Sequence, residues 1–244
     1  MEQQRLSLRM HAADYRSVVG TLMYASLACR PDISYATSQL SLFSSNPGLK
    51  HWQAAERVFR YLKTTKGRTL THSMSVGDVP VSTFEPKIVA YSDSDHAGCL
   101  DTRRSTTGFV VYVEGNLVSW SSKRQPTVAL SSAEAEYMAL SETAKEILWL
   151  RYLIEEIIGH SLTTPAVLYC DNQAALAIGK NDVDHSRTKH IDYRYHFIRE
   201  CVQRQQIELR WVPTRAQHAD MLTKALSPQA FSTISSLVMK DRLH

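Results

Sequence analysis

The fold is decided by residues 87–140, which read KIVAYSDSDHAGCLDTRRSTTGFVVYVEGNLVSWSSKRQPTVALSSAEAEYMAL. Three β-rich runs come first: KIVAYSD at 87–93, TGFVVYV at 107–113 and LVSWSSK at 117–123. The last two runs are separated by Glu114-Gly115-Asn116, which is a hairpin signal. The stretch therefore predicts three successive strands, two of which are joined by a tight turn.

A long helix is predicted to follow these strands, over about residues 132–158. Ser131 and Glu134 form a capping box at its start, and Gly159 supplies a stop signal at its end. The next apolar run, AVLYCD at 166–171, is typical of a strand.

The rest of this half continues the alternation of strands and helices. NQAALAIG at 172–179 predicts a short helix, and HSRTKHIDYRYHFIRECVQRQ at 185–205 predicts a longer one. IELRWVP at 207–213 is a strand ended by proline, and ADMLTKAL at 219–226 is a last short helix. This order of elements predicts an α/β fold in which helices flank a mixed sheet.

Residues 11–66 have a different pattern, because their apolar residues recur at helical spacing. One stripe runs from Tyr15 to Cys29, a second from Ile33 to Phe43, and a third from Trp52 to Leu62. Each stripe needs a partner that covers it, so a small unit of three helices is expected.

These patterns predict a division of the chain into four parts. Residues 1–66 form the helical unit, and 67–86 form a connector that contains one hairpin. Residues 87–228 form the α/β domain, and 229–244 form a C-terminal tail.

The composition is that of an ordinary globular protein, with 244 residues, 43% hydrophobic and 21% charged. The net charge of +4 is mildly basic and is compatible with a polyanionic partner. The four cysteines are far apart and include no C-x-x-C pair, which argues against a disulfide framework and fits a reducing compartment. The chain starts without an apolar signal region and contains no apolar run of transmembrane length, so we expect an intracellular protein without a membrane partner.

Four acidic residues lie at element boundaries where they could meet at one edge of the sheet. Asp93 and Asp171 each end a β run, and ligand sites in open α/β sheets lie beyond the carboxyl ends of strands. Asp220 opens the last short helix. Glu136 lies on the stripe of the long helix that faces the sheet, whereas Glu134, two residues away, fills the capping role.

Each of these acids also has an ordinary local explanation. Asp93 can be a turn residue, Asp171 can cap the next helix, and Asp220 can be a first-turn acid. Glu136 can interact with the helix dipole, which is worth roughly 0.3–1 kcal/mol. Only the convergence of all four would make a site.

Converging carboxylates would favour hard divalent cations. Each like-charge pair within about 4 Å costs about 4 kcal/mol at an effective dielectric near 20, so the cluster either takes up protons or binds cations. Oxygen ligands select Mg²⁺ or Mn²⁺ over zinc. Two such ions about 3.5–4 Å apart would support in-line displacement at a phosphodiester.

Basic and polar residues outside the quartet could contact a nucleic acid backbone or groove. The candidates are Lys123, Arg124, Asn172, Gln173, Arg187, Lys189, His190, Arg194 and Arg215. A solvated amphipathic helix explains about half of those between 187 and 199 equally well. His185, His190, His196 and Cys201 fit no common zinc spacing.

Several motifs in combination resemble the carboxyl-terminal part of copia-type retrotransposon polyproteins. They are YSDSDHAGC, RRSTTGFVVYV, SWSSKRQPTVALSSAEAEYMAL, YCDNQAAL, RTKHIDYRYHFIRE and VPTRAQHADMLTKAL. The resemblance covers roughly residues 87–226, which are similar to that family's ribonuclease H domain. Residues 11–65 resemble the segment between the polymerase palm and the ribonuclease H.

The resemblance implies a ribonuclease H fold, with a five-stranded mixed sheet and flanking helices. It implies metal-dependent cleavage of the RNA strand of an RNA–DNA hybrid, with Asp93, Glu136, Asp171 and Asp220 as the catalytic, metal-binding acids. The implied cofactors are two Mg²⁺ or Mn²⁺ ions. The implied partners are the hybrid and the polymerase part of a reverse transcriptase, in a cytoplasmic particle or the nucleus.

The sequence departs from the ribonuclease H pattern in the loop before the last aspartate. Many ribonucleases H carry a mobile histidine there, but Arg215 stands at about that place in this chain. His218 is two residues before Asp220 and is the candidate for an assisting histidine. Polymerase motifs such as Tyr-x-Asp-Asp are absent.

Two other functions remain open from the sequence. An integrase or transposase is the alternative within nucleic-acid enzymes, although its acids usually run Asp, Asp, Glu. A catalytically silent nucleic-acid-binding or accessory module, derived from a retroelement, is the alternative from another class.

Overall fold

The computed structural model describes residues 2–73, 83–180 and 189–241, and the described chain divides into two units. One unit comprises Thr71–Ile234, and the other comprises Met1–Leu70 with Ser235–His244.

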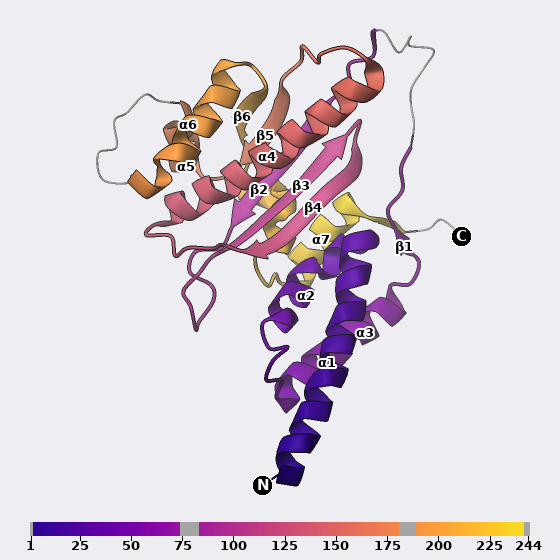
Figure 1. Cartoon of the computed structure of the whole chain (residues 1–244). Coiled ribbons are helices and arrows are strands. Elements are labelled where there is room, and N and C mark those ends of the chain that lie inside the picture. The colour runs from indigo at the N-terminus through magenta and orange to yellow at the C-terminus, as the bar shows by residue number, and fades with distance from the viewer. Residues whose placement is uncertain (1, 74–82, 181–188, 242–244) are drawn as a thin grey trace. The chain divides into compact units, whose positions relative to one another are not determined.

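The larger unit contains a five-stranded sheet with the strand order β4-β3-β2-β5-β6 (Figure 1). Its strands are β2 (Ile88–Ser94), β3 (Thr106–Val113), β4 (Asn116–Arg124), β5 (Ala166–Cys170) and β6 (Ile207–Trp211). The β2, β3 and β4 strands pair antiparallel, whereas β5 pairs parallel with both β2 and β6. The predicted mixed sheet of the ribonuclease H-like fold is therefore confirmed.

The turn between β3 and β4 is the hairpin that the sequence predicts. Glu114 and Gly115 both have positive φ angles, of 50° and 73°. Two successive residues in the left-handed region are the signature of a turn whose twist matches the flanking strands.

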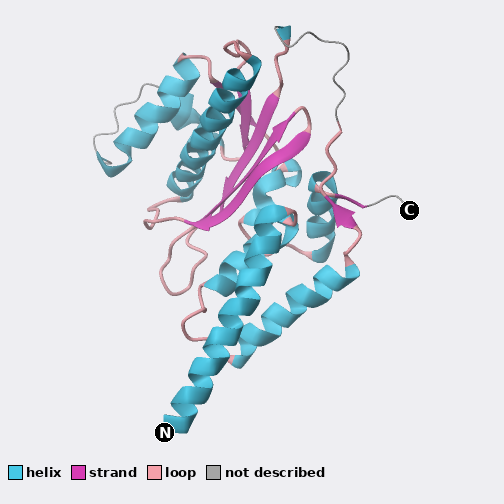
Figure 2. Ribbon diagram, turned by 45° about the vertical axis from the view of Figure 1, so that its right-hand side comes forward, coloured by secondary structure: helices cyan, strands magenta, loops and turns pink. Residues whose placement is uncertain are grey.

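Three helices pack on one face of the sheet: α4 (Ser132–Ile158), α5 (Gln173–Lys180) and α6 (Lys189–Gln203) (Figures 1 and 2). The bounds of α4 agree with the prediction. Ser131 Oγ accepts a hydrogen bond from the Glu134 backbone N–H at 3.1 Å, and Gly159 ends the helix with a φ of 79°. The Glu134 carboxylate accepts from the Leu130 N–H at 2.8 Å, so it secures the turn before the cap.

The core of this unit lies between α4 and the inward face of the sheet. Ile88, Ala90 and Leu168 from the strands pack with Leu140 and Ile147 from α4, and all five are buried. Neighbouring residues of a strand point to opposite faces, so Tyr91 points away from α4. There its ring stacks on His218, which belongs to the short helix η4 (His218–Leu222). The sheet thus has α4 on one face and η4 on the other. The short helix η3 (Thr214–Ala216) precedes η4.

The smaller unit begins with the three predicted helices. They are α1 (Glu2–Ala28), α2 (Ser34–Ser41), preceded by the turn η1 (Pro31–Ile33), and α3 (Leu49–Thr64). Tyr15, Leu22 and Ala55 are the most buried members of its core. A buried ion pair also ties this unit together: Arg30 donates to both Asp32 carboxylate oxygens, at 2.9 and 2.7 Å.

Residues 74–82 of the connector, where the hairpin is expected, lie outside the described residues. Before them, β1 (Arg68–Thr69) pairs antiparallel with β7 (Lys240–Asp241). One expectation for the ends of the domains needs correction. The segment 229–244 is not a simple tail, because it contains most of the helix α7 (Pro228–Val238) as well as β7. Ile234 and Val238 are buried and lie at helical spacing. The many serines and threonines around them make this helical pattern hard to recognise in the sequence.

Candidate active site

The four predicted acids arrive at one end of the sheet from four different elements. Asp93 lies in β2, and Asp171 follows the last residue of β5. The parallel pair β2–β5 is in register at Tyr91 and Tyr169, so each aspartate stands two residues beyond a matched position. Glu136 comes from the beginning of α4, and Asp220 comes from η4 on the opposite face.

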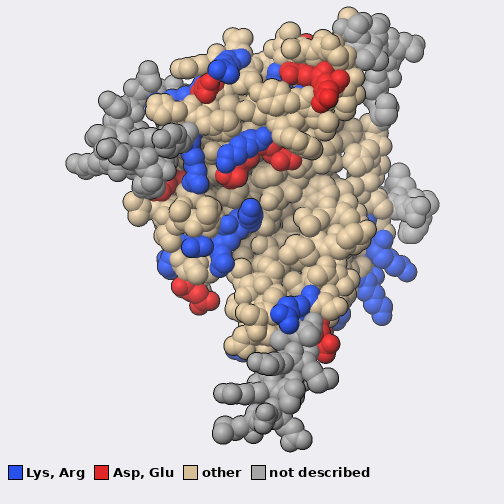
Figure 3. Space-filling view, in the orientation of Figure 1, with Lys and Arg blue, Asp and Glu red and all other residues tan. Residues whose placement is uncertain are grey.

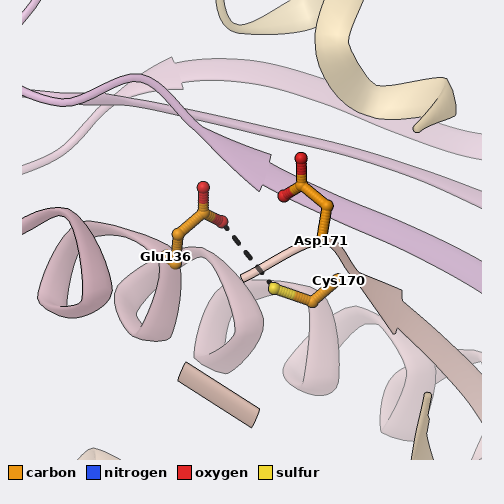
Figure 4. A group of neighbouring side chains, drawn as sticks. All are labelled: Glu136, Cys170 and Asp171. Carbon is orange, nitrogen blue, oxygen red and sulfur yellow. Dashed lines mark hydrogen bonds between the residues drawn. The ribbon is translucent and has the colours of Figure 1, made fainter. Parts of the chain in front are cut away.

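The carboxylates form two overlapping groups that share Asp171. Oxygens of Asp93, Asp171 and Asp220 all lie within 4.8 Å of one another. A second group, also within 4.8 Å, contains Glu136, Asp171 and the thiol of Cys170. Figure 4 shows the carboxylates of Glu136 and Asp171 pointing to the same side, with the Cys170 sulfur within 4.0 Å of Glu136 Oε2. The sequence-predicted quartet therefore converges.

Burial and mutual repulsion make this cluster reluctant to carry its full negative charge. Burial raises the pKa of Glu136 to about 9, and the carboxylates of Asp93 and Asp171 add to the rise. Burial likewise raises the pKa of Asp93 to about 7, with Lys224 opposing the rise and Asp220 adding to it. The pKa of Asp220 is raised by burial as well. Without a cation, the cluster would hold protons near neutral pH.

The thiol beside the cluster is a poor metal ligand at ordinary pH. Burial raises the pKa of Cys170, and the neighbouring Glu136 raises it further. Only the thiolate binds metals well, so the protonated sulfur leaves oxygens as the donors. An all-oxygen donor set favours Mg²⁺ or Mn²⁺.

Local hydrogen bonds orient two of the four acids. The Thr223 hydroxyl donates to Asp93 Oδ2, and the Thr214 hydroxyl donates to Asp171 Oδ2 at 2.8 Å. The start of α5 is capped by Asn172, whose Oδ1 accepts from the Ala175 N–H at 3.0 Å. The cap role that could have explained Asp171 thus belongs to its neighbour, so that the Asp171 carboxylate is available to the cluster.

Lys224 is a member of the site that acid-based reasoning did not include. Its ammonium lies 2.8 Å from Asp220 Oδ1 and 3.6 Å from Asp93 Oδ2. Burial opposes its charged form, but the two carboxylates outweigh burial and raise the pKa of Lys224. The sequence carried a signal for it, because residues four apart on a helical turn are neighbours.

Gly108 allows η4 to approach the sheet closely. Gly108 is paired with Asp93 across the β2–β3 ladder. A Cβ at this position would lie 2.6 Å from Thr223 Cγ2 and 2.8 Å from Leu222 Cβ. The missing side chain therefore lets Asp220 in η4, and Thr223 and Lys224 just after it, lie close to the strand that carries Asp93.

His218, the candidate for the assisting role, and Arg215, a predicted nucleic-acid contact, lie in different settings. The His218 ring stacks on Tyr91 at 4.1 Å, and the Tyr112 hydroxyl lies 3.0 Å from His218 Nδ1. Burial lowers the pKa of His218, which keeps its ring neutral. Arg215 is exposed in η3, the turn that begins at Thr214.

The predicted nucleic-acid contacts separate into three groups. Lys123, Arg124 and Arg194 line one cavity beside α4. Asn172 serves as the α5 cap, and Gln173 is exposed next to it. Arg187 and the side chains of Lys189 and His190 lie outside the described residues, as does His185 of the rejected zinc set.

Among the described residues, no helix is long and apolar enough to cross a membrane.

Comparisons with known proteins give close relatives over almost the whole chain. The chain is 42% identical over 229 residues to the retrovirus-related Pol polyprotein from transposon TNT 1-94 of Nicotiana tabacum, which covers 94% of this chain and 16% of the relative. It is 42% identical over 238 residues to the Pol polyprotein from transposon RE1 of Arabidopsis thaliana, covering 94% and 15%. The chain thus spans about a sixth of these relatives' length. No family model matches.

A solved structure shares the architecture at low sequence identity. It is described as the foamy viral protease-reverse transcriptase dRH in complex with ds DNA, with 12% identity and a TM-score of 0.50. The match covers 83% of this chain and 32% of that one, which is a likeness of fold alone. The identity to transposon Pol polyproteins, along nearly the full chain, shows that the chain belongs to the copia-type retrotransposon Pol family and corresponds to its carboxyl-terminal, ribonuclease H-like part.

Proposed function

We propose that this chain is a metal-dependent endonuclease that cleaves the RNA strand of RNA–DNA hybrids. The observation that carries the proposal is the convergence of Asp93, Glu136, Asp171 and Asp220, with Asp171 shared between two groups of ligand atoms. The Pol relatives support the same reading, because a reverse-transcribing element produces RNA–DNA hybrids that have to be resolved.

The donor set fits two hard divalent ions. Asp93, Asp171 and Asp220 would hold one ion, and Glu136 with Asp171 would hold the other. When bound, Mg²⁺ or Mn²⁺ ions supply an activated water and stabilise the oxygen that leaves the phosphodiester. Their charge would also replace the protons that the raised pKa values of Asp93 and Glu136 otherwise require.

The chain's own residues fix the geometry of the carboxylates. Thr223 and Thr214 hold Asp93 and Asp171 in place through their hydroxyls. Lys224 offsets the repulsion between Asp93 and Asp220. Such prior orientation matters because a displacement of about 1 Å can cost roughly 100-fold in rate.

The test is cleavage of an end-labelled RNA–DNA hybrid by the full chain in Mg²⁺ or Mn²⁺, together with Asp171→Asn and Glu136→Gln. We expect cleavage of the RNA strand only, abolished by EDTA and reduced at least about 100-fold in both variants. Matched controls are Asp101→Asn, in an exposed loop, and Glu156→Gln, on the exposed side of α4. Both should cleave like the wild type.

The opposite outcome would favour the silent module. Hybrid binding without metal-dependent cleavage would contradict the proposed nuclease function. Full activity of Asp171→Asn would contradict it as well. An integrase-like activity would instead appear as metal-dependent cleavage or joining of duplex DNA ends, and the order Asp, Glu, Asp, Asp disfavours it.

We further propose that the chain works beside the polymerase part of its polyprotein, inside the cell. The relatives are several times longer than this chain and are Pol polyproteins. Co-expression of the preceding polymerase segment should raise hybrid affinity if the two parts cooperate, and unchanged affinity would argue that the chain acts alone.

A further inference from the structure

A cavity of about 650 Å³ lies along α4, away from the carboxylate cluster. Met138, Glu142, Lys145 and Trp149 form its helical wall at spacings of four, three and four residues. That spacing defines one stripe of the helix, and Glu136 is not on it. Phe109 and Ser121, from neighbouring strands, contribute the opposite wall.

The cavity brings together basic residues that are distant in sequence. Lys123 and Arg124 end strand β4, Lys145 belongs to α4, and Arg194 comes from α6. Figure 3 shows Lys and Arg side chains, with Asp and Glu side chains among them, on the face of the molecule where α4 and β4 lie in Figure 1.

The acids of the cavity are already engaged. Glu142 pairs with Lys145 at 2.8 Å, and Glu146 accepts from the Ser119 hydroxyl at 2.7 Å. No described acidic residue lies within ion-pair distance of Lys123 or Arg194. Four basic residues line the cavity against these two acids, so the cavity carries a net positive charge.

Gln125 gives a second, independent sign of a ligand. Its side chain is 3% exposed, and its Nε2 donates to Thr107 Oγ1 at 3.1 Å and to the Ala135 carbonyl at 2.9 Å. Those two bonds fix the orientation of the amide. Its Oε1 is buried and accepts no hydrogen bond from the described residues. A buried acceptor without a donor costs roughly 1–3 kcal/mol, so a ligand N–H would relieve it.

Trp149 adds an aromatic surface at the rim. It is 56% exposed, although a ring of this size usually finds cover. Successive bases of a single strand stack on such rings, whereas a duplex keeps its bases covered. The cavity volume lies within the range of about 300–1,000 Å³ that is typical of sites for small molecules, which suits one nucleotide.

We propose that this cavity binds one nucleotide of a single-stranded nucleic acid. The phosphate lies at Lys123, Arg124 and Arg194, the base stacks on Trp149, and Gln125 Oε1 accepts from an exocyclic amino group. The site extends the proposed function, because it would hold a strand that leaves the hybrid bound at the carboxylates. It does not depend on cleavage.

The experiment measures fluorescence anisotropy of 5′-fluorescein-labelled oligodeoxycytidylate and oligothymidylate hexamers with the full chain in EDTA, so that hydrolysis cannot interfere. We expect tighter binding of the cytidylate, because thymine carries a carbonyl oxygen in place of the cytosine amino group and would set an acceptor against Gln125 Oε1. Trp149→Ala should weaken binding about 5- to 100-fold, the range of one lost stacking contact. Trp149→Phe should retain most of the affinity.

Tyr152→Ala is the matched control, since Tyr152 is 58% exposed on the same helix but does not line the cavity. It should bind like the wild type. Absence of oligonucleotide binding, or equal binding by Trp149→Ala and the wild type, would overturn the proposal. If the wild type fails to cleave hybrids yet shows Trp149-dependent binding, the proposed nuclease fails and this site stands.

Discussion

At the scale of single residues, the cluster is defined as much by its lysine as by its acids. Lys224 places a positive charge between Asp93 and Asp220, where a divalent ion would also be attracted. A side chain that is 39% exposed can move aside when a better cation arrives. Lys224 would thus compete with an ion at this position, and it stabilises the cluster when no ion is bound.

We expect Lys224→Met to bind Mn²⁺ more tightly, by roughly three- to tenfold. The substitution removes an ammonium group that competes with the ion, and its attraction to the carboxylates is at most a few kcal/mol. The metal-free variant should also melt at a lower temperature. Isothermal titration and thermal melts check both effects. Lys87→Met, an exposed lysine of the same unit, is the control. Weaker Mn²⁺ binding would show that Lys224 helps to build the ion site instead.

The raised pKa values of Glu136 and Asp93 predict how stability depends on pH. Both acids bind protons in the folded chain at pH values where the unfolded chain has released them. At pH below about 4, both states are protonated and no penalty exists. As pH rises toward about 9, the unfolded state is increasingly favoured.

We therefore expect the melting temperature in EDTA to fall between pH 5 and pH 9, and Mg²⁺ to raise it most at the alkaline end. Glu136→Gln should flatten the EDTA profile, because it removes the acid with the larger shift. Melts monitored by circular dichroism across this range provide the measurement. A profile that rises with pH would contradict the assigned sign.

At the scale of elements, one glycine controls the distance between η4 and the sheet. The contacts that a Cβ at position 108 would meet include the Leu222 Cβ and the Ala219 carbonyl, at 2.8 and 3.2 Å. These atoms are fixed by the backbone and cannot rotate away. Any added atom must therefore move the element that carries Asp220.

We expect Gly108→Ala to destabilise the fold by about 1–3 kcal/mol, the usual cost of overpacking. It should also lower metal-dependent cleavage more than tenfold, because Asp220 and Thr223 move together. Urea denaturation and the hybrid assay separate the two effects. Gly67→Ala is the control, since no atom lies within 4 Å of its added Cβ. Wild-type cleavage by Gly108→Ala would show that η4 tolerates the shift.

At the scale of the whole molecule, residues near the C-terminus pair with the segment that follows the three N-terminal helices. β7 pairs with β1, and Arg68 Nη1 donates to Ser235 Oγ at 2.8 Å. The last residues therefore belong to the helical unit, although the α/β unit separates them from it in sequence.

Deletion of residues 235–244 should loosen the helical unit and leave the sheet intact. Limited proteolysis should then cut first within residues 1–70, and the fragment that survives should begin near Thr71. Mass spectrometry of the fragments identifies the cut. The reverse order, with early cuts in the sheet, would show that the deleted residues support the α/β unit.

Much of the fold was predictable because local signals agreed with the final packing. The capping box at Ser131 and the stop signal at Gly159 predicted α4. The β-rich runs predicted its neighbouring strands. The four acids were predictable from their places at element ends. Lys224 and Gly108 were missed because their roles depend on close approach across the sheet. The place of α7 was missed because it depends on a contact distant in sequence, the hydrogen bond from Arg68 to Ser235.

The order in which the chain is synthesised determines when the carboxylate cluster can form. Asp93 and Glu136 leave the ribosome well before Asp171 and Asp220, and the parallel β2–β5 pair cannot close until residues 166–170 have been made. Until η4 is synthesised, the early acids lack both Thr223 and Lys224. The nascent sheet therefore lacks the complete carboxylate cluster, which forms only when synthesis of this region is finished.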